Sequence, residues 1–269
     1  MKFSGLVSCL AVASAANAAS VKKCRNDHLP TTKIANVEVV WTPLVQDAVE
    51  LIKAFIPLQP YLYGHLMRSW LFGAAALNNN ATLKAEVDLE AHAIGTLLHD
   101  LGWDMRPNSP WHSSDQPFEV DSGLGAVDFV KEHKLSGWSD SRLEKIYDGI
   151  TLQGMGSYLP GKNFDTKFIV QSVEFEFPGP RSPLIKDADY DSILGEYPND
   201  TVFRGTNETF TWLALTKPNG TRNTFVDFFG TSYVPGYGPQ GHLGFDLITQ
   251  GLHNEVALYP NATFVSHLH

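Results

Sequence analysis

The sequence is poor in cysteine, has no excess of basic residues and contains no long hydrophobic run. Two cysteines in 269 residues exclude a framework of several disulfide bonds. With 20 Lys and Arg residues against 29 Asp and Glu residues, the net charge is −9, so we expect no binding to the phosphate backbone of nucleic acids. Because no apolar run approaches the roughly 20 residues that span a bilayer, no membrane helix is expected.

What is present is the composition of a globular protein, 43% hydrophobic and 12% aromatic. The length allows one large domain or two small ones. We expect a single domain over residues 19–269, with a core at about 40–198 and a C-terminal extension at 199–269. The oligomeric state is left open.

The N-terminus has the features of a secretory signal peptide. A short basic start precedes an apolar run at residues 6–13, and Ala16-Asn17-Ala18 is a cleavage site of the small-x-small type. We therefore predict that residues 1–18 are removed and that the mature protein is secreted. Cys24 would then be its single cysteine, without an internal disulfide. A buried N-terminal helix is the alternative.

Five Asn-x-Ser/Thr sequons, none with proline in the middle, support secretion and predict N-glycosylation at the surface. Their asparagines are Asn80, Asn199, Asn207, Asn219 and Asn261.

The hydrophobic pattern predicts an all-α fold. A first helix begins at Thr42-Pro43, an N-cap followed by proline, and stops before Pro57. Further helices are expected at residues 61–77, 88–101, 121–133, 141–152 and 187–194, and an apolar run of uncertain type covers 168–175. Beyond residue 198 glycine, proline, asparagine and aromatic residues become frequent, which indicates a loop-rich extension. Within it, residues 210–216 form a short strand or a helix.

The strongest chemical signal is the adjacent pair His99-Asp100 at the end of an apolar helix, within Leu97-Leu98-His99-Asp100-Leu101-Gly102. Imidazole and carboxylate groups are suitable ligands for a divalent transition metal. His65 lies on the preceding helix, where Gly64 and Gly73 would permit close approach to a neighbour. A lone His99 would more often be a hydrogen-bonded histidine, but the combination favours a metal site.

These residues, with several other segments, resemble the HD superfamily of metal-dependent hydrolases, and within it the fungal cyanamide hydratase-like group. The resemblance is carried by Tyr63-Gly64-His65, residues 96–102, 118–121 and 177–180, and Lys217-Pro218 with residues 223–226. It implies an HD-type helical bundle that binds Zn or Fe through His65, His99, Asp100 and a last acidic residue. It also implies that Asp100 orients or deprotonates the attacking water.

Two positions depart from the family pattern. Gln153 stands where relatives have a histidine, and a neutral amide is a poor ligand for a transition metal. The last acid is usually an aspartate, whereas the ungapped match here is Glu176 and a shifted match is Glu174. We expect Glu176 to be the fourth metal ligand and Gln153 to contact the substrate.

Other residues near the motif are candidates for the pocket. Glu119 matches a glutamate close to the pocket of relatives and is expected to be catalytic, although an acid in a first helical turn also stabilises the helix dipole. Trp103 and His112 are expected to contact the substrate in a small apolar pocket.

The leading hypothesis is a secreted hydratase or hydrolase that attacks a nitrile- or cyanamide-like small molecule with metal-activated water. A phosphohydrolase on the same fold would need positive charge at the pocket, and only Arg68 and Arg106 lie near the motif. Two further hypotheses are a non-catalytic secreted protein that kept the fold and a biosynthetic cyclase or isomerase.

Overall fold

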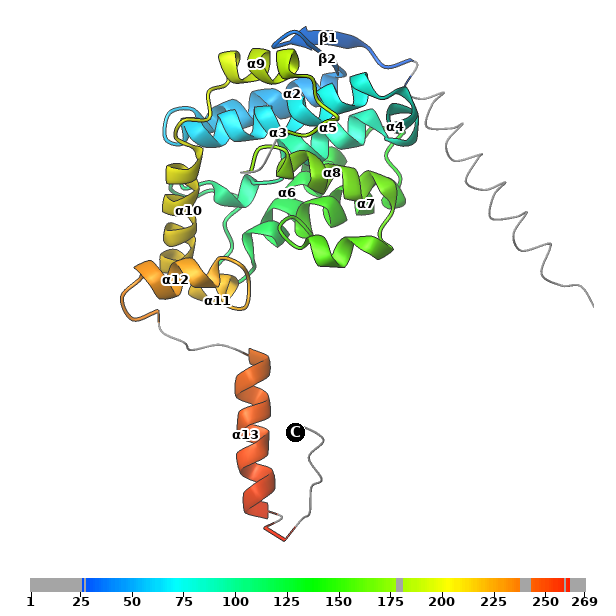
Figure 1. The fold of residues 1–269 in the computed structure, drawn as a ribbon. Coiled ribbons are helices and arrows are strands. Elements are labelled where there is room, and N and C mark those ends of the chain that lie inside the picture. The colour runs from blue at the N-terminus through cyan, green and yellow to red at the C-terminus, as the bar shows by residue number, and fades with distance from the viewer. Residues whose placement is uncertain (1–25, 27, 178–180, 238–242, 259, 262–269) are drawn as a thin grey trace, which may run out of the picture.

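The computed structural model describes residues 26, 28–177, 181–237, 243–258 and 260–261. Helices make up most of these residues (Figure 1), which confirms the predicted all-α fold. The helices are α2 (Pro43–Ile52), α3 (Pro60–Asn79), α4 (Ala81–Glu86), α5 (Leu89–Leu97), α6 (Phe118–Glu132), α7 (Asp140–Thr151), α8 (Phe164–Glu174), α9 (Asp187–Glu196), α10 (Val202–Thr216), α11 (Pro218–Thr221), α12 (Asp227–Tyr233) and α13 (Leu243–Leu258). Three 3₁₀ segments accompany them: η1 (Lys53–Phe55), η2 (Leu101–Trp103) and η3 (Gly156–Gly161).

Two predictions about the N-terminal part of the chain lie outside the described residues. These are the signal peptide at residues 1–18 and the state of Cys24. Among the residues that are described, no helix is long and apolar enough to cross a membrane.

A short antiparallel hairpin, β1 (Thr31–Ile34) and β2 (Val37–Val40), precedes the helices and was not predicted. Its turn residues Ala35 and Asn36 have φ angles of 48° and 60°, as a two-residue hairpin turn requires. Strands of four residues are too short to show a clear alternation of apolar and polar positions.

The helix starts follow the capping signals in the sequence. Thr42 caps α2 by accepting a hydrogen bond from the Val45 amide, and Pro43 occupies its first turn. The expected helix at 88–101 is shorter, because α5 ends at Leu97 and the chain then turns into η2. His99 and Asp100 therefore lie in the turn between α5 and η2, where adjacent side chains can point to the same side.

Helix α3 is buried along most of its length and packs against α5 and α8. A Cβ atom at Gly73 would lie 2.4 Å from both His92 Nε2 and Ser172 Oγ, so glycine is required for this close contact. Gly64 leaves room for the Arg68 side chain of the same helix, because a Cβ atom there would lie 2.7 Å from Arg68 Nη1. Close packing of α3 on α5 brings His65 toward the His99-Asp100 turn.

A buried polar network fixes the start of α5. Asp88 caps the helix through the Ala91 amide, and its carboxylate binds Arg142 of α7 at 2.7 and 2.8 Å. Arg142 also binds Glu90 at 2.8 Å and lies over the Trp138 ring. Because the charges are paired and hydrogen-bonded, the network holds α5 in one position on α7.

The expectation of a loop-rich extension after residue 198 is wrong for the described residues. Helix α10 runs along one side of the bundle, and α11 and α12 lie near its end (Figure 1). Val202, Thr206, Phe210 and Leu213 are buried at helical spacing, and Phe210 and Leu213 belong to the hydrophobic core. The core thus continues past residue 198, and the frequent glycines and asparagines concealed this helical period.

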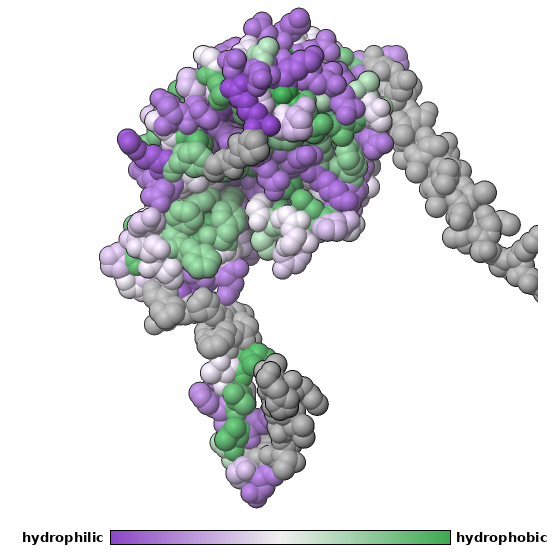
Figure 2. All heavy atoms as spheres, viewed as in Figure 1, coloured by the Kyte–Doolittle hydropathy of each residue, from purple (hydrophilic) through white to green (hydrophobic). Residues whose placement is uncertain are grey.

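Helix α13 lies apart from the helical body in Figure 1. Its described side chains Ile248, Leu252 and Val256 are exposed, and Figure 2 shows hydrophobic side chains along one side of this helix.

Candidate metal centre

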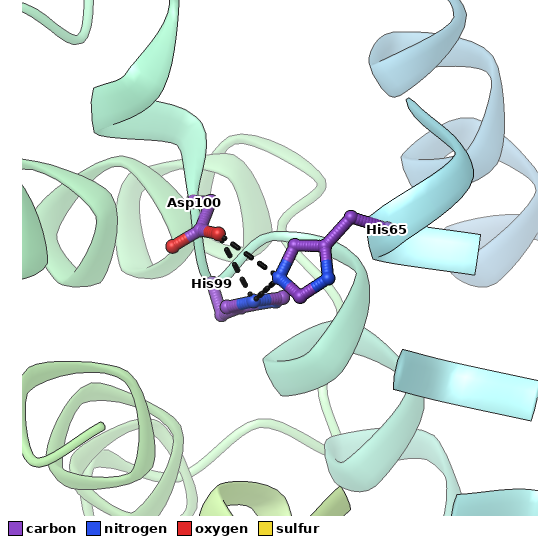
Figure 3. Close-up of side chains that lie close together, drawn as sticks. All are labelled: His65, His99 and Asp100. Carbon is purple, nitrogen blue, oxygen red and sulfur yellow. Dashed lines mark hydrogen bonds and ion pairs between the residues drawn. The ribbon is translucent and has the colours of Figure 1, made fainter. Parts of the chain in front are cut away.

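His65, His99 and Asp100 form a compact buried cluster (Figure 3). The two Nε2 atoms lie 3.0 Å apart, and Asp100 Oδ2 lies 3.3 Å from His65 Nε2 and 3.2 Å from His99 Nε2. Helix α3 supplies His65, and the turn after α5 supplies the other two side chains. The sequence prediction that these three residues come together is confirmed.

The His99 ring is oriented by a hydrogen bond to the last turn of the preceding helix, α5. Its Nδ1 lies 2.8 Å from the Thr96 carbonyl oxygen, which only accepts hydrogen bonds. Nδ1 therefore carries the hydrogen, and the lone pair of Nε2 faces the cluster. A hydrogen bond at the far nitrogen that fixes the tautomer is typical of histidines that bind metals.

The His65 ring is held in the same manner by Glu176. Its Nδ1 lies 2.5 Å from Glu176 Oε2, on the side of the ring opposite Asp100. The other carboxylate oxygen, Oε1, accepts a hydrogen bond from Arg68 Nε at 2.5 Å. Arg68 also donates to the carbonyl oxygens of Tyr197 and Pro198.

The expectation that Glu176 is the fourth metal ligand is therefore corrected. Both of its oxygens are engaged by His65 Nδ1 and Arg68, and it lies outside the group of possible ligands. Glu174, the shifted match, is an exposed residue that lines the neighbouring cavity and is likewise outside the group. Glu176 is instead a tether that orients His65.

The carboxylate of Asp100 shows that the cluster suits a cation. It is 1% exposed, and neither oxygen has a hydrogen-bond partner. Two 2.1 Å bonds at a tetrahedral angle place two ligand atoms about 3.4 Å apart. The separations of 3.0 to 3.3 Å are close to that value, so a small divalent ion fits after shifts of a few tenths of an ångström.

The cluster is electrostatically coupled. Burial alone would lower the pKa of His65, but the charge of Glu176, the contact with Asp100 and the hydrogen bond to Glu176 raise it to about 9. Burial alone would raise the pKa of Asp100, but His99 and His65 lower it to about 2. Without a metal, a proton on His65 therefore balances the Asp100 charge at neutral pH.

Gln153 lies beside the cluster but is not aimed at it as a ligand. Its Nε2 donates a hydrogen bond to the His99 backbone carbonyl at 2.8 Å and so supports the turn that carries the His-Asp pair. The residue is buried and lines the cavity next to the cluster, where it was expected to contact a substrate.

A cavity of about 150 Å³ opens beside His65 and Asp100. Trp103 lines it, as the sequence predicted, and stacks on the His65 ring with 5.8 Å between ring centroids. Thr206 and Phe210 of α10 and Phe225 line it as well. The sequence pattern did not indicate Thr206 and Phe210, since they lie in the segment expected to be an extension, and their helical spacing was the available signal. Phe225 belongs to residues 223–226, which carry part of the resemblance, but it was not predicted to line the pocket.

Glu119 is buried at the first turn of α6, and its Oε2 has no hydrogen-bond partner. Burial raises the pKa of its carboxyl to about 7, with smaller raising effects from Asp100 and Asp121, against lowering effects from its own backbone and Lys217. Asp100 thus influences Glu119 electrostatically, although Glu119 is not one of the residues that line the cavity.

The structure does not place His112 in the cavity wall. Its ring packs on Trp212 with 4.7 Å between ring centroids, and it is only partly buried. Burial, followed by the charge of Lys217, lowers the pKa of His112. The expectation that it contacts a substrate is therefore not supported by its position, because the aromatic side chains of Trp103 and Phe118 form the wall instead.

The cationic side chains near the motif form ion pairs with carboxylates. Arg106 binds Asp104 at 2.7 and 2.8 Å, and the fully buried Lys217 binds Asp121 at 2.5 Å. Arg68 is paired with Glu176. Among the described residues that line the cavity there is no lysine or arginine.

No protein-family model matches the chain, and no curated protein matches its sequence significantly. The resemblance to the HD superfamily therefore stays a prediction, and a functional assignment depends on the geometry of the cluster and the cavity.

Proposed function

We propose that this protein is a metal-dependent hydratase or hydrolase of the HD type that acts on a small molecule. The observation that supports it is the convergence of two imidazole Nε2 atoms and an otherwise unpartnered carboxylate at the end of a cavity. Zinc or iron is the expected ion, because imidazole and carboxylate ligands suit both.

A divalent ion held by His65, His99 and Asp100 would polarise a substrate and lower the pKa of a bound water. The protein contributes ligands that are already oriented, because Thr96 and Glu176 fix the two rings. Mainly apolar walls, including Trp103, exclude bulk water from the reacting end.

We assign proton transfer to Asp100 and Glu119. Asp100 stays ionised at neutral pH and can accept a hydrogen bond from water through an oxygen that no protein group occupies. Glu119, whose carboxyl has a pKa of about 7, exists in both protonation states near neutral pH and, because it does not line the cavity, would exchange protons with a substrate nitrogen or oxygen through an intervening water.

Phosphate monoesters are less suitable substrates for this cavity. Phosphoryl transfer requires positive charge around the transferred group, in addition to the metal. Arg68, Arg106 and Lys217 are each paired with a buried carboxylate and do not line the cavity.

The proposal is tested by turnover in matched variants. The full chain, loaded with zinc or iron, is assayed against nitriles, amides and phosphate monoesters of similar size. Hydration or hydrolysis of an uncharged substrate that is lost in His99→Ala and kept in His253→Ala, a change at an exposed histidine of α13, supports it. Absence of turnover in a metal-loaded wild-type protein, or equal turnover in both variants, contradicts it.

We also propose that the protein is secreted and glycosylated. Asn199, Asn207, Asn219 and Asn261 are exposed. Asn80 is partly exposed, and its Oδ1 caps α4 through the Leu83 amide. Expression in a eukaryotic secretory host should yield a chain that begins at Ala19 and loses mass on treatment with a glycosidase; retention of residues 1–18 would contradict secretion by this route.

A further inference from the structure

We infer that the cavity selects a compact, uncharged and mainly apolar molecule about the size of a benzene derivative, with one polar reactive group facing His65 and Asp100. The inference rests on the proposed function only in taking the His-Asp end as the reacting end. It narrows the substrate class from small electrophiles in general to aromatic or branched aliphatic ones.

The apolar character comes from a continuous aromatic wall. The Phe210 ring lies 5.0 Å from Trp103, 5.9 Å from Phe118 and 5.2 Å from Phe225 between centroids. Phe177, which is 39% exposed, adds a ring against His65. Such walls bind flat or branched apolar groups through buried area and edge-to-face contacts.

The size of the cavity excludes very small polar molecules as its best ligands. An apolar cavity of about 150 Å³ accommodates a benzene molecule, and the volume here is about 150 Å³. A molecule of three heavy atoms, such as cyanamide, would leave most of the aromatic wall without contacts. A nitrile or related group on a six-membered ring or a branched chain would fill it.

The charge distribution disfavours charged ligands. Anions meet no unpaired cation in the wall, because the neighbouring arginines and the buried lysine are bound to carboxylates. Cations would meet Glu174 and the aromatic rings favourably, but they would be repelled by a divalent ion at the His-Asp end. An uncharged ligand needs no cation in the cavity wall and is not repelled by the divalent ion.

Two donors on cavity-lining side chains are available to orient such a molecule. Trp103 Nε1 and Thr206 Oγ1 are buried and have no hydrogen-bond partner. Unpaired buried polar groups are costly in a folded protein, and a ligand acceptor would satisfy them. Thr206 is therefore assigned as a specificity-determining residue.

The test compares three probes of the same shape on the full wild-type chain by calorimetry and ligand-observed NMR: benzonitrile, benzoate and benzylamine. Each is titrated into metal-free and zinc-loaded protein. In zinc-loaded protein we expect saturable binding of benzonitrile, at least tenfold tighter than either charged probe. Equal or tighter binding of benzoate or benzylamine, or no binding of benzonitrile, overturns the inference.

Four variants locate the binding. Val173→Phe fills the cavity and should weaken benzonitrile binding at least tenfold, whereas Val256→Phe, the same change at an exposed position of α13, should not. Thr206→Val should weaken it several-fold, and Thr206→Ser should keep it. If Val173→Phe does not fold, the Thr206 pair still decides; unchanged binding in Thr206→Val removes that residue from recognition.

The two proposals fail in different ways. A chain that binds benzonitrile but takes up no metal contradicts the proposed function and supports the cavity assignment. A chain that takes up zinc and turns over a charged or three-atom substrate, but does not bind benzonitrile, contradicts the cavity assignment alone.

Discussion

Replacing Glu176 by glutamine separates its role as a tether from a role as a metal ligand. The amide oxygen of glutamine can still accept the hydrogen bond from His65 Nδ1, but the negative charge that faces Arg68 is lost. Loss of an outer partner of a metal-binding histidine lowers metal affinity by roughly 10–100-fold. We therefore expect Glu176→Gln to bind zinc 10–100-fold more weakly, and not to lose binding.

The same change should lower stability, because Arg68 is 0% exposed. Removing one partner of a buried ion pair costs about 3–5 kcal/mol. The carbonyl oxygens of Tyr197 and Pro198 still accept from Arg68, so the lower end, about 3 kcal/mol, is expected. For a chain of this length that corresponds to a decrease in Tm of roughly 6–12 °C.

A double variant distinguishes the two effects. Arg68→Met combined with Glu176→Gln removes the unpaired charge, and an apolar replacement of a buried pair is often neutral for stability. Thermal unfolding in a chelator and zinc titration against a chromophoric competitor are measured for both variants. We expect the double variant to recover most of the Tm that Glu176→Gln loses relative to wild type and to keep the weakened zinc affinity of Glu176→Gln. Complete loss of zinc binding in Glu176→Gln, or recovery of zinc affinity in the double variant, would refute the claim that Glu176 orients His65 without binding the metal.

Three further predictions concern protonation and the scaffold. Since the folded pKa of Glu119 is raised to about 7, its contribution to stability is complete below about pH 4.5 and is lost as the pH rises through 7. Glu119→Gln should thus be more stable than wild type by about 3 kcal/mol at pH 8, with the difference vanishing near pH 4.5 in chemical unfolding; a pH-independent difference would contradict this. Because the pKa of His65 is raised to about 9, zinc binding at pH 7.5 should release about one proton, seen by calorimetry in two buffers of different ionisation enthalpy; no buffer dependence would contradict it. Asp88→Ala should destabilise the fold by about 3 kcal/mol, the lower end for a broken buried pair because Arg142 keeps Glu90 as a partner, whereas Asp140→Ala, an exposed acid in the first turn of α7, should change it by less than about 1 kcal/mol.

The helices and the three clustered residues could be predicted because their signals are local. The Thr42-Pro43 cap and the apolar stripe before His99 depend on residues within a few turns. The pairing of His65 with the His99-Asp100 turn spans only 34 residues and two neighbouring helices. The resemblance in the order of the motifs was sufficient to predict that these three side chains cluster.

The role of Glu176 could not be predicted, because it depends on which side of the His65 ring the carboxylate reaches from 111 residues away. Spacing along the chain holds no information about that side. Arg68, one turn after His65 on a helix that is buried along most of its length, was the available signal, since a buried cation requires an acidic partner. Likewise, the wall formed by Thr206 and Phe210 became clear only when α10 was seen to pack on the core.

The most direct test of the metal centre is anomalous diffraction from crystals of the native chain grown with zinc or iron. The account predicts one peak among His65 Nε2, His99 Nε2 and Asp100 Oδ2, about 2.0–2.2 Å from each, with Glu176 outside the coordination sphere. A cluster that stays without a peak after exposure to zinc, iron, manganese and nickel, or a peak coordinated by Glu176, would contradict it.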